Sequence, residues 1–177
     1  MQIKKLSLVV MLLSLTMLLM PSAFANGCDG VIIKKWLDCG SAPTCGLGIY
    51  PEEPWVWFVG ISVRNDNPYT ITNVYVEDRF GAEFAVTVES GPNYGTVSLT
   101  TKGASNKVFL EWDIGSLGPG AWAGVLLRVQ TDLNPAGRPE FTSCGEYYMN
   151  SGAVVKWLDD LGKQHSLETG TIMVTTY

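Results

Sequence analysis

The sequence predicts an all-β protein, built as a two-sheet Greek-key sandwich of about eight or nine antiparallel strands. Three observations carry this prediction. Apolar side chains alternate with polar ones through many short segments, turn-forming residues separate these segments, and no stretch beyond the N-terminal 25 residues has a helical period. Short strands with regular turns favour a sandwich over a barrel or an α/β fold.

The strands are expected in a simple order along the chain. They lie at residues 31–37, 55–63, 70–78, 84–89, 95–101, 108–114, 123–129, 147–158 and 166–176. The alternation is clearest in 55–63, 108–114 and 123–129, where every second residue is apolar, as in a half-buried antiparallel strand. Gly, Pro, Asn, Asp and Ser are concentrated in the intervening turns, at 65–68, 91–93, 103–106, 118–120 and 159–162.

Residues 1–25 read as a secretory signal peptide. Lys4 and Lys5 precede an apolar run at 6–20, and the small-x-small sequence at 23–25 is a cleavage site. A permanent membrane anchor is the alternative, but a run of 15 residues is short for a bilayer span. A lipid anchor on Cys28 is a second alternative, although the leucine usual before a lipidated cysteine is missing.

The mature chain, residues 26–177, is expected to form a single domain. Its 152 residues carry a net charge of −7, which argues against nucleic acid as a partner. The full sequence has 46% apolar and 16% charged residues, a composition that excludes disorder as the main state. No further segment is long and apolar enough to span a membrane, so export to the cell surface, the medium or a periplasm is expected.

The aromatic residues divide into two sets. Trp55, Trp57, Trp112 and Trp157 fall in phase with Val and Ile, which predicts a core position. The candidate interaction surface consists of Val31, Ile32, Trp36, Trp122, Tyr147 and Tyr148. It includes the strand at 31–37, an edge that could pair with a neighbouring sheet, although Lys34 and Lys35 oppose such pairing.

Enzyme chemistry finds little support in the sequence. The single histidine, His165, is expected in a solvated turn, and motifs for serine nucleophiles, zinc proteases and phosphate loops are missing. A glycosidase would need two of the carboxylates to meet, with Glu52, Glu53, Glu77, Asp78, Glu111 and Asp113 as candidates. Calcium could involve Asp66, Asp159 and Asp160, but turn formation explains them. We therefore expect no catalytic residue, metal or cofactor.

Several motifs resemble those of a known domain. The segments VGISVRN at 59–65, ITNVYVEDRF at 71–80, WDIGSLGPG at 112–120 and NSGAVVKWL at 150–158 occur in the order and spacing of the repeat domain called domain of unknown function eleven, found in prokaryotic surface proteins. The resemblance covers residue 31 to the C-terminus and implies an Ig-like fold. The chain differs from that family in having one copy and a Cys-containing insertion at 38–54.

The resemblance implies a non-catalytic structural, adhesive or assembly module at the cell surface, such as a filament or surface-layer subunit, with itself or other surface proteins as partners. A secreted carbohydrate-binding module with a polysaccharide partner is the alternative. Some Ig-like adhesin domains also cross-link a lysine of the first strand to a late asparagine beside an acidic residue. Residues of these types are Lys34 or Lys35, Asn150, and Asp78 or Glu77.

Export also favours two disulfides among Cys28, Cys39, Cys45 and Cys144, with three pairings open and irregular spacing against zinc. An Ig-like strand order favours the pairs Cys45–Cys144 and Cys28–Cys39.

Overall fold

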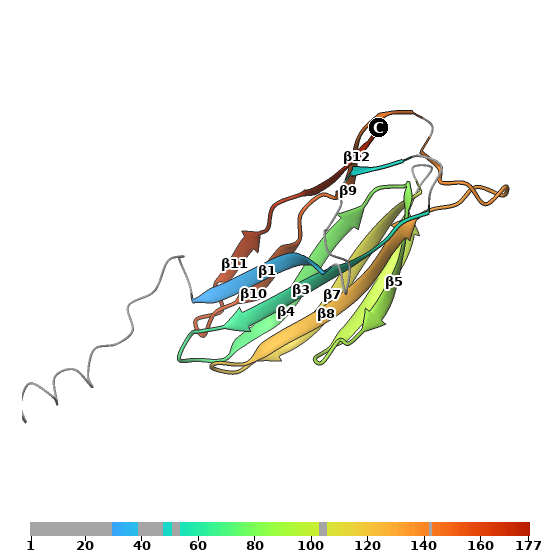
Figure 1. Cartoon of the computed structure of the whole chain (residues 1–177). Helices are drawn as coiled ribbons and strands as arrows, with labels where there is room; N and C mark the ends of the chain where they lie inside the picture. The colour runs from blue at the N-terminus through green and yellow to red at the C-terminus, as the bar shows by residue number, and fades with distance from the viewer. Residues whose placement is uncertain (1–29, 39–47, 51–53, 103–105, 142) are drawn as a thin grey trace, which may run out of the picture.

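The computed structural model describes residues 30–38, 48–50, 54–102, 106–141 and 143–177. The predicted signal peptide and three of the four cysteines lie outside these residues. Within them, all regular structure is β, arranged as two sheets packed face to face (Figure 1). The predicted all-β sandwich is therefore confirmed. None of the described residues forms a helix long and apolar enough to cross a membrane.

The first sheet has four antiparallel strands and begins with an edge strand. Its order is β1 (Val31–Asp38), β3 (Val56–Asn65), β8 (Trp122–Thr131) and β5 (Phe84–Ser90). The pairing of β1 with β3 and of β3 with β8 runs without a shift in register. The strands predicted at 31–37, 55–63 and 123–129 match β1, β3 and β8 within two residues at each end. The first strand is an edge, as expected.

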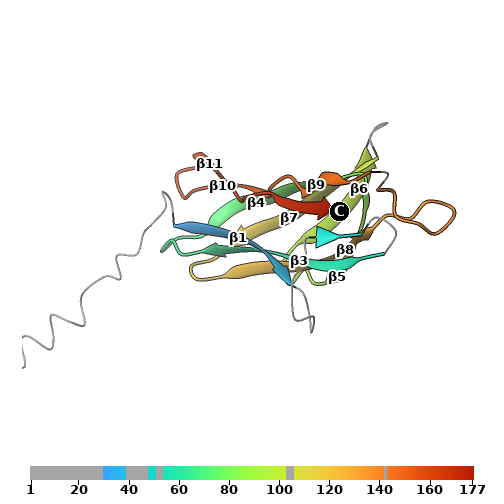
Figure 2. The same ribbon diagram turned by 45° about the horizontal axis from the view of Figure 1, so that its top comes forward.

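The second sheet has eight strands. Its main path runs β11 (Gln164–Glu168), β10 (Val154–Leu158), β4 (Ile71–Phe80), β9 (Gly145–Asn150), β12 (Ile172–Thr176) and β2 (Gly48–Ile49). β7 (Lys107–Leu117) pairs with β4 and carries β6 (Thr96–Lys102) on its other side. Figure 2 shows the two layers edge on, with β1 beneath β10 and β11.

The twelve strands exceed the predicted eight or nine for two reasons. The expected strands at 147–158 and 166–176 are each interrupted, giving β9 with β10 and β11 with β12. The break after Asn150 includes Gly152, whose φ of +106° is strained for any residue with a side chain. The insertion at 38–54 also adds β2, which pairs with β12 in parallel, whereas all other pairs are antiparallel.

The core lies between the sheets and contains the tryptophans that the alternation assigned to it. Trp57, Trp112 and Trp157 are 3%, 0% and 1% exposed. Trp55 is half-buried and stacks on Trp57 with 6.3 Å between the ring centroids. The expected position of His165 was wrong, because it belongs to β11 and stacks on Trp157.

Candidate functional site

The most unusual side chain inside the sandwich is a lysine on the edge strand β1. The strand alternates regularly, with Ile32, Lys34 and Trp36 exposed and the residues between them directed toward the core. Lys35 falls on the inward face with Val31, opposite Ile61 of β3. Lys35 is half-buried there, and burial of a charged amine is costly unless the amine has partners.

Two polar residues of the opposite sheet meet Lys35. Asp78 lies on the inward face of β4 and is 4% exposed, while Asn150 ends β9 and is fully buried. β4 and β9 join at the pair of Phe80 with Asn150, which brings Asn150 close to Asp78. The sandwich therefore places a lysine, an asparagine and an aspartate together although they are distant in sequence.

Hydrogen bonds link the three side chains in a row. Lys35 Nζ donates to Asn150 Oδ1. Asn150 Nδ2 donates to Asp78 Oδ2 at 2.6 Å, and Asp78 Oδ1 accepts the backbone N–H of Arg79 at 2.7 Å. The backbone N–H of Gly152 donates to Asn150 Oδ1 at 3.0 Å, so the side-chain carbonyl accepts from two donors.

Burial acts on the two ionisable groups in opposite directions. Loss of solvation lowers the pKa of Lys35, with Asp78 and Glu168 opposing that shift. Loss of solvation raises the pKa of Asp78, against the effects of Lys35 and of the hydrogen bond from Asn150. Both shifts favour the uncharged pair, a free amine beside a carboxylic acid. A free amine is a nucleophile, and a buried carboxylic acid can act as a general acid.

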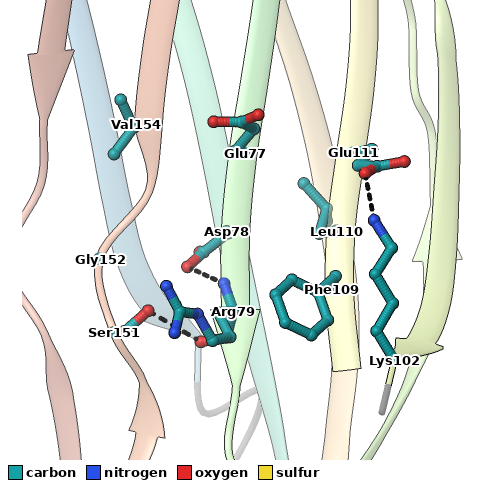
Figure 3. Close-up of a pocket in the computed structure, with 10 residues that line it drawn as sticks. All are labelled: Glu77, Asp78, Arg79, Lys102, Phe109, Leu110, Glu111, Ser151, Gly152 and Val154. Atoms are coloured by element: carbon teal, nitrogen blue, oxygen red, sulfur yellow. Dashed lines mark hydrogen bonds and ion pairs between the residues drawn. The ribbon is translucent and has the colours of Figure 1, made fainter. Parts of the chain in front are cut away.

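A surface cleft is lined in part by Asp78, the last member of this row (Figure 3). Its volume is ≈ 350 Å³, and Asp78, Ser151 and Gly152 form part of its wall. Glu77 and Glu111 stand on its outer side, each in an ion pair with a lysine: Lys156 at 2.5 Å and Lys102 at 2.6 Å. Asp78 contributes to the wall of the cleft but is only 4% exposed.

The carboxylates proposed as a glycosidase pair are not arranged for that reaction. Glu77 and Glu111 are cross-strand neighbours, whereas Asp78 points to the other face of β4. Because each glutamate is ion-paired with a lysine, neither has the apolar surroundings that make a carboxyl a general acid. Asp113 is exposed, and Glu52 and Glu53 lie outside the described residues.

The remaining polar candidates have structural partners. Asp66 pairs with Arg64 at 2.6 Å, and Asp159 contacts His165 Nε2 at 2.8 Å. Asp159 also accepts the backbone N–H of Leu161, as a turn aspartate does. Asp160 is exposed, and the described residues contain no group of three or more side chains suited to hold a metal ion.

The predicted interaction surface is only partly brought together. Ile32, Trp36 and Trp122 are exposed on the outer face of the first sheet, and Tyr148 is exposed on β9 of the second sheet. Val31 is 5% exposed and points into the core, and Tyr147 packs edge-on against Phe141 with 4.5 Å between centroids. Val31 therefore does not belong to an exposed surface, whereas Tyr147 is half-buried beside Tyr148.

The disulfide prediction cannot be compared with geometry. Cys144 is exposed just before β9, but Cys28, Cys39 and Cys45 lie outside the described residues. The two bridges and their pairing remain predictions.

Comparison with known proteins gives neither a family nor a function. No family profile and no curated protein match the sequence. Among solved structures, BcpA, the major pilin subunit of Bacillus cereus, is similar at 14% identity and a TM-score of 0.47, over 82% of this chain and 40% of that chain. AggA, the major subunit of aggregative adherence fimbriae from Escherichia coli, matches at 13% identity and 0.40, over 85% and 96% of the two chains.

The collagen-binding domain of a Staphylococcus aureus adhesin matches at 11% identity and a TM-score of 0.35, over 86% of this chain and 99% of that domain. An exo-β-N-acetylglucosaminidase from Vibrio harveyi matches at 10% and 0.36, over 80% of this chain and 18% of the enzyme. This chain spans about two fifths of the length of the pilin it matches. At such scores these likenesses carry no assignment.

Proposed function

We propose that this chain is a structural module of the cell exterior, used for adhesion or as a subunit of a surface filament or layer, and that an amide bond between Lys35 and Asn150 joins its two sheets. The observation that carries the proposal is the row of hydrogen bonds from half-buried Lys35 to buried Asn150 and on to buried Asp78. A lysine amine, an asparagine amide and a protonated carboxyl are the groups that such a bond requires.

The reaction needs no external reagent. The free amine of Lys35 attacks Asn150 Cγ, and the negative charge that develops on Oδ1 is stabilised by the Gly152 N–H. Asp78 gives its proton to Nδ2, so the C–N bond breaks and ammonia leaves. Asp78 then takes the surplus proton from Nζ, which restores its acid form. One amine and one primary amide thus become one secondary amide and ammonia.

The geometry supports each of these roles. Nδ2 faces Asp78 at 2.6 Å, which suits proton donation to the leaving nitrogen. Asp78 and Gly152 also line a surface cleft, so ammonia would be released close to solvent. Because the fold holds Lys35 Nζ in hydrogen-bond contact with Asn150, the attack benefits from the high effective concentration of an intramolecular reaction.

Intact mass spectrometry of the reduced mature protein tests the bond. We expect a mass below that of the sequence by one ammonia, and a branched peptide joining Lys35 to Asn150 after digestion. Lys35→Met, Asn150→Ala and Asp78→Ala should each restore the full mass. Lys34→Met is the matched control, since its side chain points outward, and it should keep the loss of ammonia. The full sequence mass in the unsubstituted protein would overturn the proposal.

The surface role rests on the predicted signal peptide and on the resemblance to the surface-protein repeat. In addition, the candidate carboxylates among the described residues are not arranged as a glycosidase pair. Antibody labelling of native cells, viewed by negative-stain electron microscopy, tests it. We expect label on the outside of the cell, on filaments or in a layer. Label confined to the cell interior would refute the surface role and leave the amide bond untouched.

A further inference from the structure

The outer face of the first sheet combines two exposed indoles with basic side chains. Trp36 on β1 is 43% exposed and Trp122 on β8 is 57% exposed, both on the side away from the core. Nothing in the proposed cross-link uses this face, because Lys35 points the other way. Exposed tryptophans on a flat sheet face need an explanation, since their burial in a core would stabilise the fold.

Each indole lies over a glycine. Three atoms of the Trp36 ring cover the position where a side chain at Gly60 of β3 would project, so this ring lies flat on the sheet. The six-membered ring of Trp122 approaches Gly124 on its own strand, with Cζ3 2.6 Å from the position of an added Cβ. The glycines let the rings settle against the backbone and leave their other side to solvent.

The two rings are close enough to act together. Gly60 is the register partner of Leu126, two residues along β8 from Gly124. One strand spacing of about 4.8 Å and two residues of about 3.3 Å each place the glycines roughly 8 Å apart. That distance is within the span of a short oligosaccharide.

Polar and basic groups line the space beside Trp122. A groove of ≈ 360 Å³ is bounded by Ile32, Lys34, Ser62, Arg64, Gly120 and Trp122. Arg128 lies further along the same face, opposite Phe58. The outward positions of β1, β3 and β8 hold three basic residues, Lys34, Arg64 and Arg128, and one carboxylate residue, Asp38, which ends β1 in register with Phe58. Asp66, in the turn after β3, pairs with Arg64 at the rim.

We propose that this face binds an anionic polysaccharide. The apolar face of a sugar ring stacks on an indole, and carboxylate groups on the polymer pair with Lys34 and Arg64. A second copy of the chain is the competing occupant. It fits less well, because the centres of interfaces between proteins are depleted in lysine, whereas here Lys34 stands in the groove. The proposal does not depend on the amide bond.

Affinity electrophoresis in gels containing alginate, a polymer of uronic acids, tests the proposal, with tryptophan fluorescence as a second measurement. We expect alginate to retard the protein, and Trp36→Ala and Trp122→Ala each to weaken binding by about tenfold. Binding should also weaken as salt rises, because the ion pairs lie at the surface. Tyr148→Ala is the matched control, since Tyr148 is 61% exposed on the other sheet, and it should bind as the parent does.

Three results would overturn the proposal. Equal, salt-independent retardation by a neutral glucan would show that the charged groups play no part. Dimerisation that Trp122→Ala abolishes, without retardation by alginate, would assign the face to a second copy of the chain. A monomer that alginate does not retard would leave the face without this function. Loss of ammonia measured on the same samples keeps any of these results separate from the fate of the cross-link.

Discussion

Removing the amine of Lys35 should lower the stability of the protein by an amount that follows from chain topology. Lys35 and Asn150 are 115 residues apart, and a covalent link across a loop of this size reduces the entropy of the unfolded chain. The loop-closure relation used for disulfides gives about 5 kcal/mol at 25 °C. For a domain of about 150 residues, each kcal/mol shifts the melting temperature by roughly 2–4 °C. We therefore expect Lys35→Met to melt roughly 10–20 °C below the parent.

Thermal unfolding followed by circular dichroism measures this difference, with Lys34→Met as the control. Both substitutions replace a lysine of β1 by a side chain of similar length, but only Lys35 faces Asn150. A methionine at this half-buried position also removes the cost of burying an amine, which acts against the expected drop in stability. If the parent has lost ammonia and yet Lys35→Met and Lys34→Met have the same melting temperature, the loop-closure reasoning is wrong.

Three further predictions concern the rest of the sandwich. Trp112→Ala should destabilise by roughly 3–5 kcal/mol in denaturant titrations because the indole is fully buried, and an unchanged midpoint would contradict that burial. Asn65→Ala should lower the free energy of unfolding by about 1–3 kcal/mol in the same assay, because the buried amide donates to Leu117 O at 2.9 Å and that carbonyl would lose a partner. Asn93→Ala is the comparison, since this amide lies in an exposed loop. The hydrogen bond from His165 lowers the pKa of Asp159 in the folded protein. The ionised Asp159 therefore stabilises the fold above the ordinary aspartate pKa, and this stabilisation is lost as pH falls through the lower folded value. Asp159→Asn should make the free energy of unfolding depend less on pH in that acid range, and an unaltered profile would argue against the contact.

The alternation of side chains predicted the sandwich and most of its strands. Buried and exposed residues alternate along β1, β3, β7 and β8, as the sequence predicts, because each strand buries one face. A shift in register by one residue would expose the core side chains. The strand breaks were missed because they depend on tertiary contacts. Gly152 interrupts the expected strand where the N–H of Ala153 turns to Thr169 Oγ1 at 2.9 Å, a bond to a distant residue.

The pairing of β2 with β12 was missed for a similar reason. A strand of two residues, Gly48–Ile49, has no period to detect. Its position depends on Thr175 and Thr176 more than a hundred residues later, and a parallel pair needs no turn signal between its strands.

The cross-link candidates were found in the sequence only as alternatives, yet the strand phase could have chosen among them. Lys35 shares its face with Val31, and Asp78 shares its face with Val76, so both were in phase with core residues. A charged residue in an apolar row signals a buried site. What the sequence could not supply is the meeting of β1 with β4 and β9, which requires the packing of one sheet on the other.

The position of the link within the chain has a mechanical consequence. If Lys35 and Asn150 are joined, the segment between them, across a sequence separation of 115, forms a closed loop that tension on the two ends cannot extend. At about 3.5 Å per residue, roughly 400 Å of chain is withheld from stretching. With this link in place, force on the two ends extends only the start of β1 and the segment from Ser151 onward. The strands β3 to β8 bear no load. A tether built from such units would keep its length under a load that strips its terminal strands.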